Sequence, residues 1–144
     1  MTTQVAFHFN AQDKPLYVCR LLRKAWLSGA RAVVLASPAE LDRIDPQLWT
    51  LAPQEFIPHA RWGQTPPAVL TASPIVLTAE VATGLPHREV LIHLGQEMPP
   101  QWNTFGRVIE VVGQDEADRL QARQRWKAYT QAGYAIERHD LMIK

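Results

Sequence analysis

Cysteine is almost absent from this sequence, which has Cys19 as its only thiol in 144 residues. A single cysteine rules out an internal disulfide framework and a cluster of thiolate metal ligands. The sequence also lacks a basic N-terminal leader, and no apolar run approaches the roughly 20 residues of a membrane helix. We therefore expect a cytoplasmic protein with no direct membrane contact.

Clustered glycines and paired histidines are missing as well. Each of the seven glycines is isolated, so neither GxxxxGK[ST] nor GxGxxG is available to hold a phosphate group. The five histidines are scattered and form no HxxxH pair that would favour a metal site. Acidic neighbours such as Asp115 and Glu116 are better explained as charges at a helix start than as an acid–base pair. We expect no cofactor, no metal ion and no catalytic residue.

An excess of one charge is also lacking, because fifteen Lys and Arg residues face fourteen Asp and Glu residues. A formal charge of +1 gives no overall field for a nucleic-acid backbone, so any use of charge must be local. Hydrophobic residues make up 47% of the chain, which is enough for a globular core. The length suits one domain, spanning residues 1–144.

The hydrophobic pattern predicts an α/β domain. Apolar runs favour strands, and apolar residues at helical spacing favour helices. The expected strands are 4–9, 31–36, 56–57, 74–78, 88–94 and 107–112, with 134–141 as a possible edge strand. The first strand, helix and second strand suggest a parallel βαβ unit. The expected fold is a mixed, partly parallel sheet flanked by helices, like a nucleotide-binding fold without its phosphate loop.

Three helices are expected, over 15–28, from Ser37 onwards and over 115–132. Ser37 and Glu40 have the spacing of a capping box for the second helix. Pro46 is expected to break that helix or make it restart. Asp115 is a plausible N-cap of the last helix, and Gly133 is placed to end it.

The last helix carries a cationic ridge, because Arg119, Arg123 and Lys127 recur every four residues, beside Trp126. Arg125 falls on the apolar side and should be partly buried against a carboxylate. The other residues expected to face the sheet are Ala117, Ala122, Ala128, Tyr129 and Ala132. From spacing alone the ridge is either an ordinary solvated face or a dock for an acidic peptide with an apolar end.

The order of several blocks resembles the chi subunit family of bacterial DNA polymerase III. The blocks are residues 25–33, 41–49, 56–59, 88–92 and 122–134. Together they span most of the chain, except for the Pro-containing stretch from about 60 to 86.

The resemblance implies a non-catalytic adaptor that binds two proteins and contacts nucleic acid mainly through them. One partner is the psi subunit, with Trp49 and Phe56 in its interface. The other is the acidic C-terminal tail of single-stranded-DNA-binding protein, held by residues Val112, Arg119, Arg123, Trp126 and Lys127. Such an adaptor links the clamp loader to coated lagging-strand template, and a repair helicase stays open as a further partner.

Two rival functions remain at this point. One is an α/β nucleotide-binding enzyme, which a titration with ATP or NAD followed by tryptophan fluorescence would reveal. The other is direct nucleic-acid binding through the ridge. Three cations make only a short footprint for a phosphate backbone, which favours the adaptor.

Overall fold

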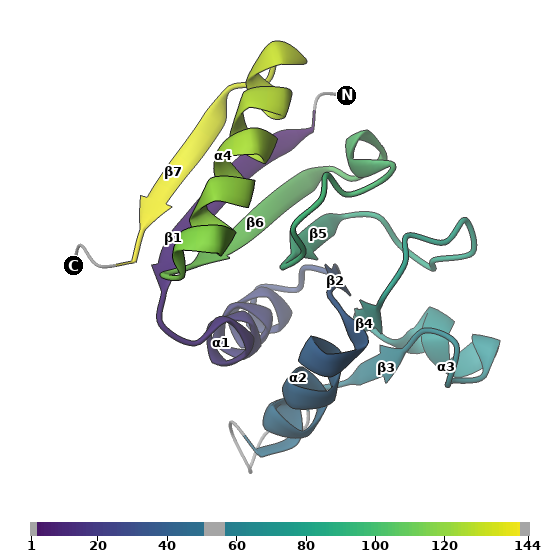
Figure 1. Ribbon diagram of the computed structural model, residues 1–144. Helices are drawn as coiled ribbons and strands as arrows, with labels where there is room; N and C mark the ends of the chain where they lie inside the picture. The colour runs from purple at the N-terminus through teal and green to yellow at the C-terminus, as the bar shows by residue number, and fades with distance from the viewer. Residues whose placement is uncertain (1–2, 51–56, 142–144) are drawn as a thin grey trace.

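A seven-stranded parallel sheet forms the centre of the computed structural model, which describes residues 3–50 and 57–141. The strand order is β3-β4-β2-β5-β6-β1-β7 (Figure 1). The strands are β1 (Gln4–Ala11), β2 (Ala32–Leu35), β3 (His59–Arg61), β4 (Ile75–Thr78), β5 (Val90–His93), β6 (Arg107–Gly113) and β7 (Ile136–Asp140). The expectation of an edge strand near the C-terminus is confirmed by β7.

The expectation of a mixed sheet was wrong, because all six strand pairings are parallel. An apolar run does not show whether its strand is parallel or antiparallel to its neighbours. The connections between the strands decide this direction. Two of them, residues 79–89 and 94–106, contain no α-helix, yet each returns the chain to the amino end of the sheet. The second contains only the 3₁₀ helix η1 (Trp102–Thr104). Without a helix in the sequence pattern, such crossovers are easily taken for turns.

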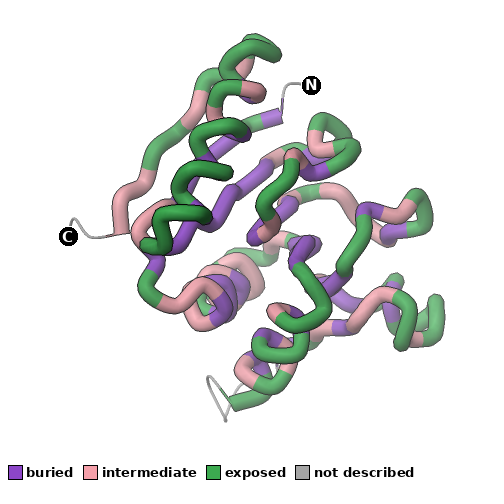
Figure 2. The backbone as a smooth tube through the Cα atoms, viewed as in Figure 1, coloured by how far each residue is buried: buried purple, intermediate pink, exposed green. Residues whose placement is uncertain are grey.

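Helices α1 (Lys14–Leu27) and α2 (Pro38–Thr50) cover one face of the sheet. Their buried side chains pack with Val34, Leu77 and Ile92 in one apolar cluster. The other face is covered by α4 (Glu116–Gln131), by the short α3 (Pro67–Ala72) and by irregular segments. Figure 2 shows the buried strands between these exposed outer layers. Because the sheet is covered on both faces, central strands such as β2 (AVVL) are continuous apolar runs.

Local sequence signals set most of the helix ends. The predicted capping box is present, with the amide of Glu40 donating to Ser37 Oγ at 3.2 Å and the amide of Ser37 donating to Glu40 Oε1 at 3.1 Å. Gly29 and Gly133 follow α1 and α4 with positive φ values of 83° and 92°, which glycine adopts without strain. The expected break at Pro46 was wrong, because α2 continues through it. Pro46 is exposed, so water can reach the backbone around it.

The Pro-containing stretch held elements that the pattern did not reveal. Strand β3 has three residues and α3 has six, lengths too short for a clear period. A strand was expected at 56–57, but Ile57 is a buried residue just before β3. Phe56 lies outside the described residues. No helix in the described parts of the chain is both long enough and apolar enough to span a membrane.

Candidate functional site

The orientation of α4 on the sheet is set by a buried polar cluster. Glu110, on β6, is fully buried and accepts hydrogen bonds from Arg125 Nε at 3.0 Å and from the Tyr129 hydroxyl at 2.7 Å. His93 Nδ1, on β5, lies 2.7 Å from the same carboxylate. Arg125 also donates to the carbonyl oxygen of Gln96 at 2.8 Å. These contacts confirm that Arg125, only 1% exposed, is buried against a carboxylate.

Burial, together with the Glu110 carboxylate, raises the pKa of Tyr129, so the phenol stays protonated and donates. Ala122 and Tyr129 are buried on the sheet side of α4, as expected, and Ala128 is half-buried. The expectation was wrong for Ala117 and Ala132, which are exposed. With Arg125 and Tyr129 fixed against the sheet, Arg119, Arg123 and Lys127 are held on the solvent side.

The exposed side of α4 forms one wall of a groove of about 590 Å³. We call this surface the α4 groove. It brings together the side chains that the sequence placed on the ridge and at the end of the preceding strand: Val112, Arg119, Arg123, Trp126 and Lys127. Among residues 3–50 and 57–141, Arg119, Arg123 and Lys127 have no acidic partner within ion-pair distance. Their charges are therefore available to a ligand.

Two residues of the α4 groove escaped the sequence analysis. Phe9 comes from β1 and Arg138 from β7, and the Arg138 guanidinium lies over the Phe9 ring at 4.9 Å from its centroid. They meet because β7 pairs with β1, with Phe7 opposite Arg138 and Phe9 opposite Asp140. The expected edge strand over 134–141 includes Arg138, so the sequence indicated that this residue lies on a strand. No local pattern indicated that this strand pairs with β1. With Arg138, four cations line the groove.

Trp126 supplies the apolar floor of the α4 groove. Its ring is tilted against Phe7, with 5.1 Å between the ring centroids, and it is half-buried. The packing holds the ring in place, and its remaining surface faces the groove beside Val112 and Ala122. Cations around a partly exposed aromatic ring are suited to a ligand that is both acidic and apolar.

Trp49, which is expected to face a second partner, lies elsewhere. Trp49 is at the end of α2, on the other face of the sheet from α4 (Figure 1). It is 48% exposed, and its ring lies 4.5 Å from that of His59, which is held by Asp45 at 2.7 Å. Phe56, the second residue of that prediction, is outside the described residues. The structure thus separates Trp49 from the α4 groove.

Thiol and metal chemistry have little support among the described residues. Burial raises the pKa of the Cys19 thiol to about 12, with a smaller contribution from Asp13, so this thiol is a poor nucleophile. Within residues 3–50 and 57–141, no three His, Cys, Asp or Glu side chains lie close enough together to hold a metal ion. The arrangement of the α4 groove is suited to binding an anionic ligand with an apolar part.

Comparison with known proteins agrees with this picture. The profile of the family described as DNA polymerase III chi subunit, HolC, matches residues 1–137. The chain is 32% identical over 124 residues to DNA polymerase III subunit chi of Haemophilus influenzae, covering 85% of this chain and 84% of the relative. It is 33% identical over 124 residues to subunit chi of Pseudomonas aeruginosa, covering 85% and 83%. It is 26% identical over 120 residues to subunit chi of Escherichia coli strain K12, covering 83% and 80%.

A solved structure shows the same fold with a much more distant sequence. It is the C-terminal domain of Saccharomyces cerevisiae Dbp5 bound to Gle1 and IP6, with a TM-score of 0.61 and 10% identity. The match covers 97% of this chain and 90% of the other, and at this identity it shows the fold alone. The family profile and the bacterial relatives carry the assignment: this chain belongs to the chi subunit family of DNA polymerase III.

Proposed function

We propose that this chi subunit is a non-catalytic adaptor whose α4 groove binds the acidic C-terminal tail of single-stranded-DNA-binding protein. One observation carries the proposal: the five residues that the family resemblance implies for the tail line a single groove. The carboxylates of an acidic tail would pair with Arg119, Arg123, Lys127 and Arg138. A terminal apolar side chain would pack on Trp126.

Charge and shape support an extended peptide more than a nucleic acid. Four cations around a partly buried tryptophan favour an anionic ligand, but they make a short footprint for a phosphate backbone. A planar guanidinium such as that of Arg123 can bind a carboxylate through two parallel hydrogen bonds. The tail therefore fits the α4 groove through both its charge and its apolar end, whereas a duplex would use only the charge.

Calorimetry with the tail peptide of the single-stranded-DNA-binding protein from the same source tests the proposal. Arg123→Glu should weaken binding by about tenfold or more, because it removes one charge-assisted contact and adds repulsion. Arg31→Glu is a matched control: it reverses the charge of another exposed arginine, which lies outside the α4 groove. It should bind the peptide as wild type does. Equal affinity of wild type and folded Arg123→Glu would leave the ridge as a solvated face.

Arg138→Ala tests whether the peptide contacts the whole α4 groove or only the ridge on α4. Arg138 is on β7, outside α4, so it matters only if the peptide contacts both walls. We expect weaker binding by the variant, and a further loss when the peptide lacks its terminal apolar residue. Binding should also weaken as the salt concentration rises, since these contacts lie at the surface. Wild-type affinity of Arg138→Ala would confine the tail to the ridge.

We further propose that the surface around Trp49 binds the psi subunit. A half-exposed tryptophan at the end of α2 is the type of residue that anchors protein interfaces. Trp49→Ala should weaken a one-to-one complex with psi and leave tail binding unchanged. Arg123→Glu should weaken tail binding and leave psi binding unchanged. The binding that each variant retains then shows that the variant is folded. Full psi binding by folded Trp49→Ala would remove this residue from the interface.

A further inference from the structure

The carboxyl ends of the central strands surround a second pocket, of about 780 Å³. We call it the switch-point pocket. After β2 the chain enters α2 on one face of the sheet, whereas after β4 and β5 it passes over the other face. Such a divergence is where open α/β sheets bind ligands. No residue lines both this pocket and the α4 groove, so the two sites are distinct.

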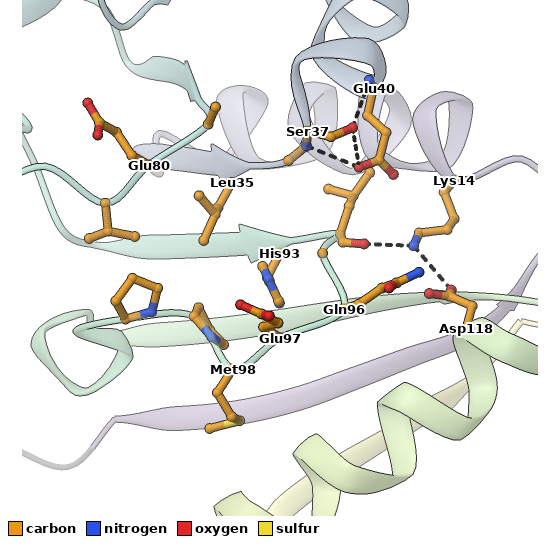
Figure 3. A pocket seen from close by; sticks show the side chains of 17 residues that line it. Lys14, Leu35, Ser37, Glu40, Glu80, His93, Gln96, Glu97, Met98 and Asp118 are labelled. Atoms are coloured by element: carbon orange, nitrogen blue, oxygen red, sulfur yellow. Dashed lines mark hydrogen bonds and ion pairs between the residues drawn. The ribbon is translucent and has the colours of Figure 1, made fainter.

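The charged lining of the switch-point pocket is mainly acidic. Figure 3 shows His93 and Glu97 in the middle of this lining, between Glu80 on one side and the Lys14–Asp118 pair on the other. Lys14 is already engaged, because its Nζ lies 3.1 Å from Asp118 Oδ2 and donates to the Leu94 carbonyl at 2.8 Å. The charged lining residues are one lysine and four carboxylates, of Glu40, Glu80, Glu97 and Asp118, which gives a formal charge of 1 − 4 = −3.

His93 adds an independent indication of a ligand. It is only 3% exposed and lines the pocket, and its Nδ1 is hydrogen-bonded to Glu110. Its Nε2 has no hydrogen-bond partner within residues 3–50 and 57–141. Gly95 keeps that nitrogen accessible, since a Cβ at this position would lie 2.8 Å from Nε2. A buried imidazole therefore presents an unpartnered nitrogen to an acidic pocket.

The hydrogen bonds around Glu110 decide what that nitrogen can do. An ionised carboxylate only accepts hydrogen bonds, so His93 Nδ1 must carry the proton that it shares with Glu110. Arg125 Nε donates to the same carboxylate oxygen at 3.0 Å. In a neutral imidazole with its proton on Nδ1, Nε2 has a free lone pair. The pocket thus offers an acceptor surrounded by carboxylates.

We propose that the switch-point pocket binds a guanidinium group, with His93 Nε2 and Glu97 as acceptors. A phosphate or nucleotide would be repelled by the net charge of −3. A guanidinium supplies donors to both acceptors, and its weak hydration suits the apolar side chains of Leu35, Val81 and Met98 that also line the pocket. The volume lies within the range of small-molecule sites. This binding is separate from the proposed adaptor function.

Nuclear magnetic resonance on the full chain tests the proposal, with N-acetyl-L-arginine amide as the probe. The ¹⁵N signal of His93 Nε2 should shift and saturate as the probe is added. N-acetyl-L-citrulline amide has nearly the same shape without the charge, and it should bind about tenfold more weakly or worse. Equal binding of the two amides, or a shift that never saturates, would overturn the proposal.

Variants locate the binding. Gly95→Ala should abolish the shift, because a Cβ at this position would lie 2.8 Å from Nε2 and block access to it. Glu97→Gln, at an exposed residue, should lower the affinity for the probe by up to about fivefold. Glu89→Gln makes the same change next to the amino end of β5 and should have no effect. Wild-type affinity of folded Gly95→Ala or of Glu97→Gln would place the probe elsewhere.

A second titration distinguishes the source of the guanidinium. Acetyl-Ala-Arg-Ala-amide carries the same group within a peptide backbone. Tighter binding of this peptide than of the single amide would indicate an arginine side chain of a partner protein. Binding of the amide alone would indicate a free small guanidinium compound. Both results support the site, and binding of neither compound would refute it.

Discussion

Glu110→Gln is the sharpest test of how α4 is fixed to the sheet. Glutamine has nearly the same shape as glutamate but no charge, so the buried Arg125 guanidinium loses its counter-ion while little cavity forms. Breaking a buried ion pair from one side typically costs about 3–5 kcal/mol of unfolding free energy. For 144 residues the unfolding entropy is on the order of 0.3 kcal/mol/K, so Tm should fall by roughly 10–17 °C.

A double-mutant cycle measures the coupling free energy between Glu110 and Arg125. Arg125→Met should also be strongly destabilising, because it leaves Glu110 buried without its guanidinium partner. The double variant Glu110→Gln/Arg125→Met should lose much less than the two single losses added together. Urea unfolding of the four proteins, followed by circular dichroism, measures these terms, and exposed Glu89→Gln serves as the control. Additive losses, or a loss below about 1 kcal/mol in both single variants, would refute the coupling.

Two predictions concern buried groups elsewhere in the fold. Burial lowers the pKa of His8 to about 4, with help from His139 and Arg107, so the unfolded chain takes up this proton first as the pH falls. Stability should therefore decrease from about pH 6.5 towards pH 4, and His8→Gln should flatten that part of a series of urea midpoints; an unchanged slope would contradict the assignment. Cys19 is buried with its thiol pKa raised to about 12, so Ellman's reagent should react with it only after unfolding, and fast reaction in the native state would contradict this burial.

Helical periodicity predicted the ridge and Arg125 correctly, because the direction of a side chain around a helix follows from its position in the sequence. The same rule was wrong for Ala117 and Ala132. Ala117 is in the first turn of α4 and Ala132 is its C-cap. Helical phase gives the direction of a side chain but not how far the sheet extends along the helix axis.

Contacts between distant segments could not be predicted in this way. Phe9 and Arg138 are 129 positions apart, and they meet because β7 pairs with β1 in one register. Likewise, the acceptor role of His93 depends on Glu110 in the neighbouring strand and on the missing Cβ of Gly95. The sequence holds no local signal for either arrangement.

The nearly neutral composition conceals a separation of charge. A formal charge of +1 is the sum over all residues, yet four cations line the α4 groove while the switch-point pocket has a formal charge of −3. Salt screens charges beyond about 10 Å at ordinary ionic strength, so a bound ligand responds mainly to the groups beside it. Net charge therefore limits long-range attraction to nucleic acid but not short-range recognition of a peptide. The salt dependence of tail binding should accordingly follow the number of groove cations, and it should become smaller in Arg138→Ala but not in Arg31→Glu.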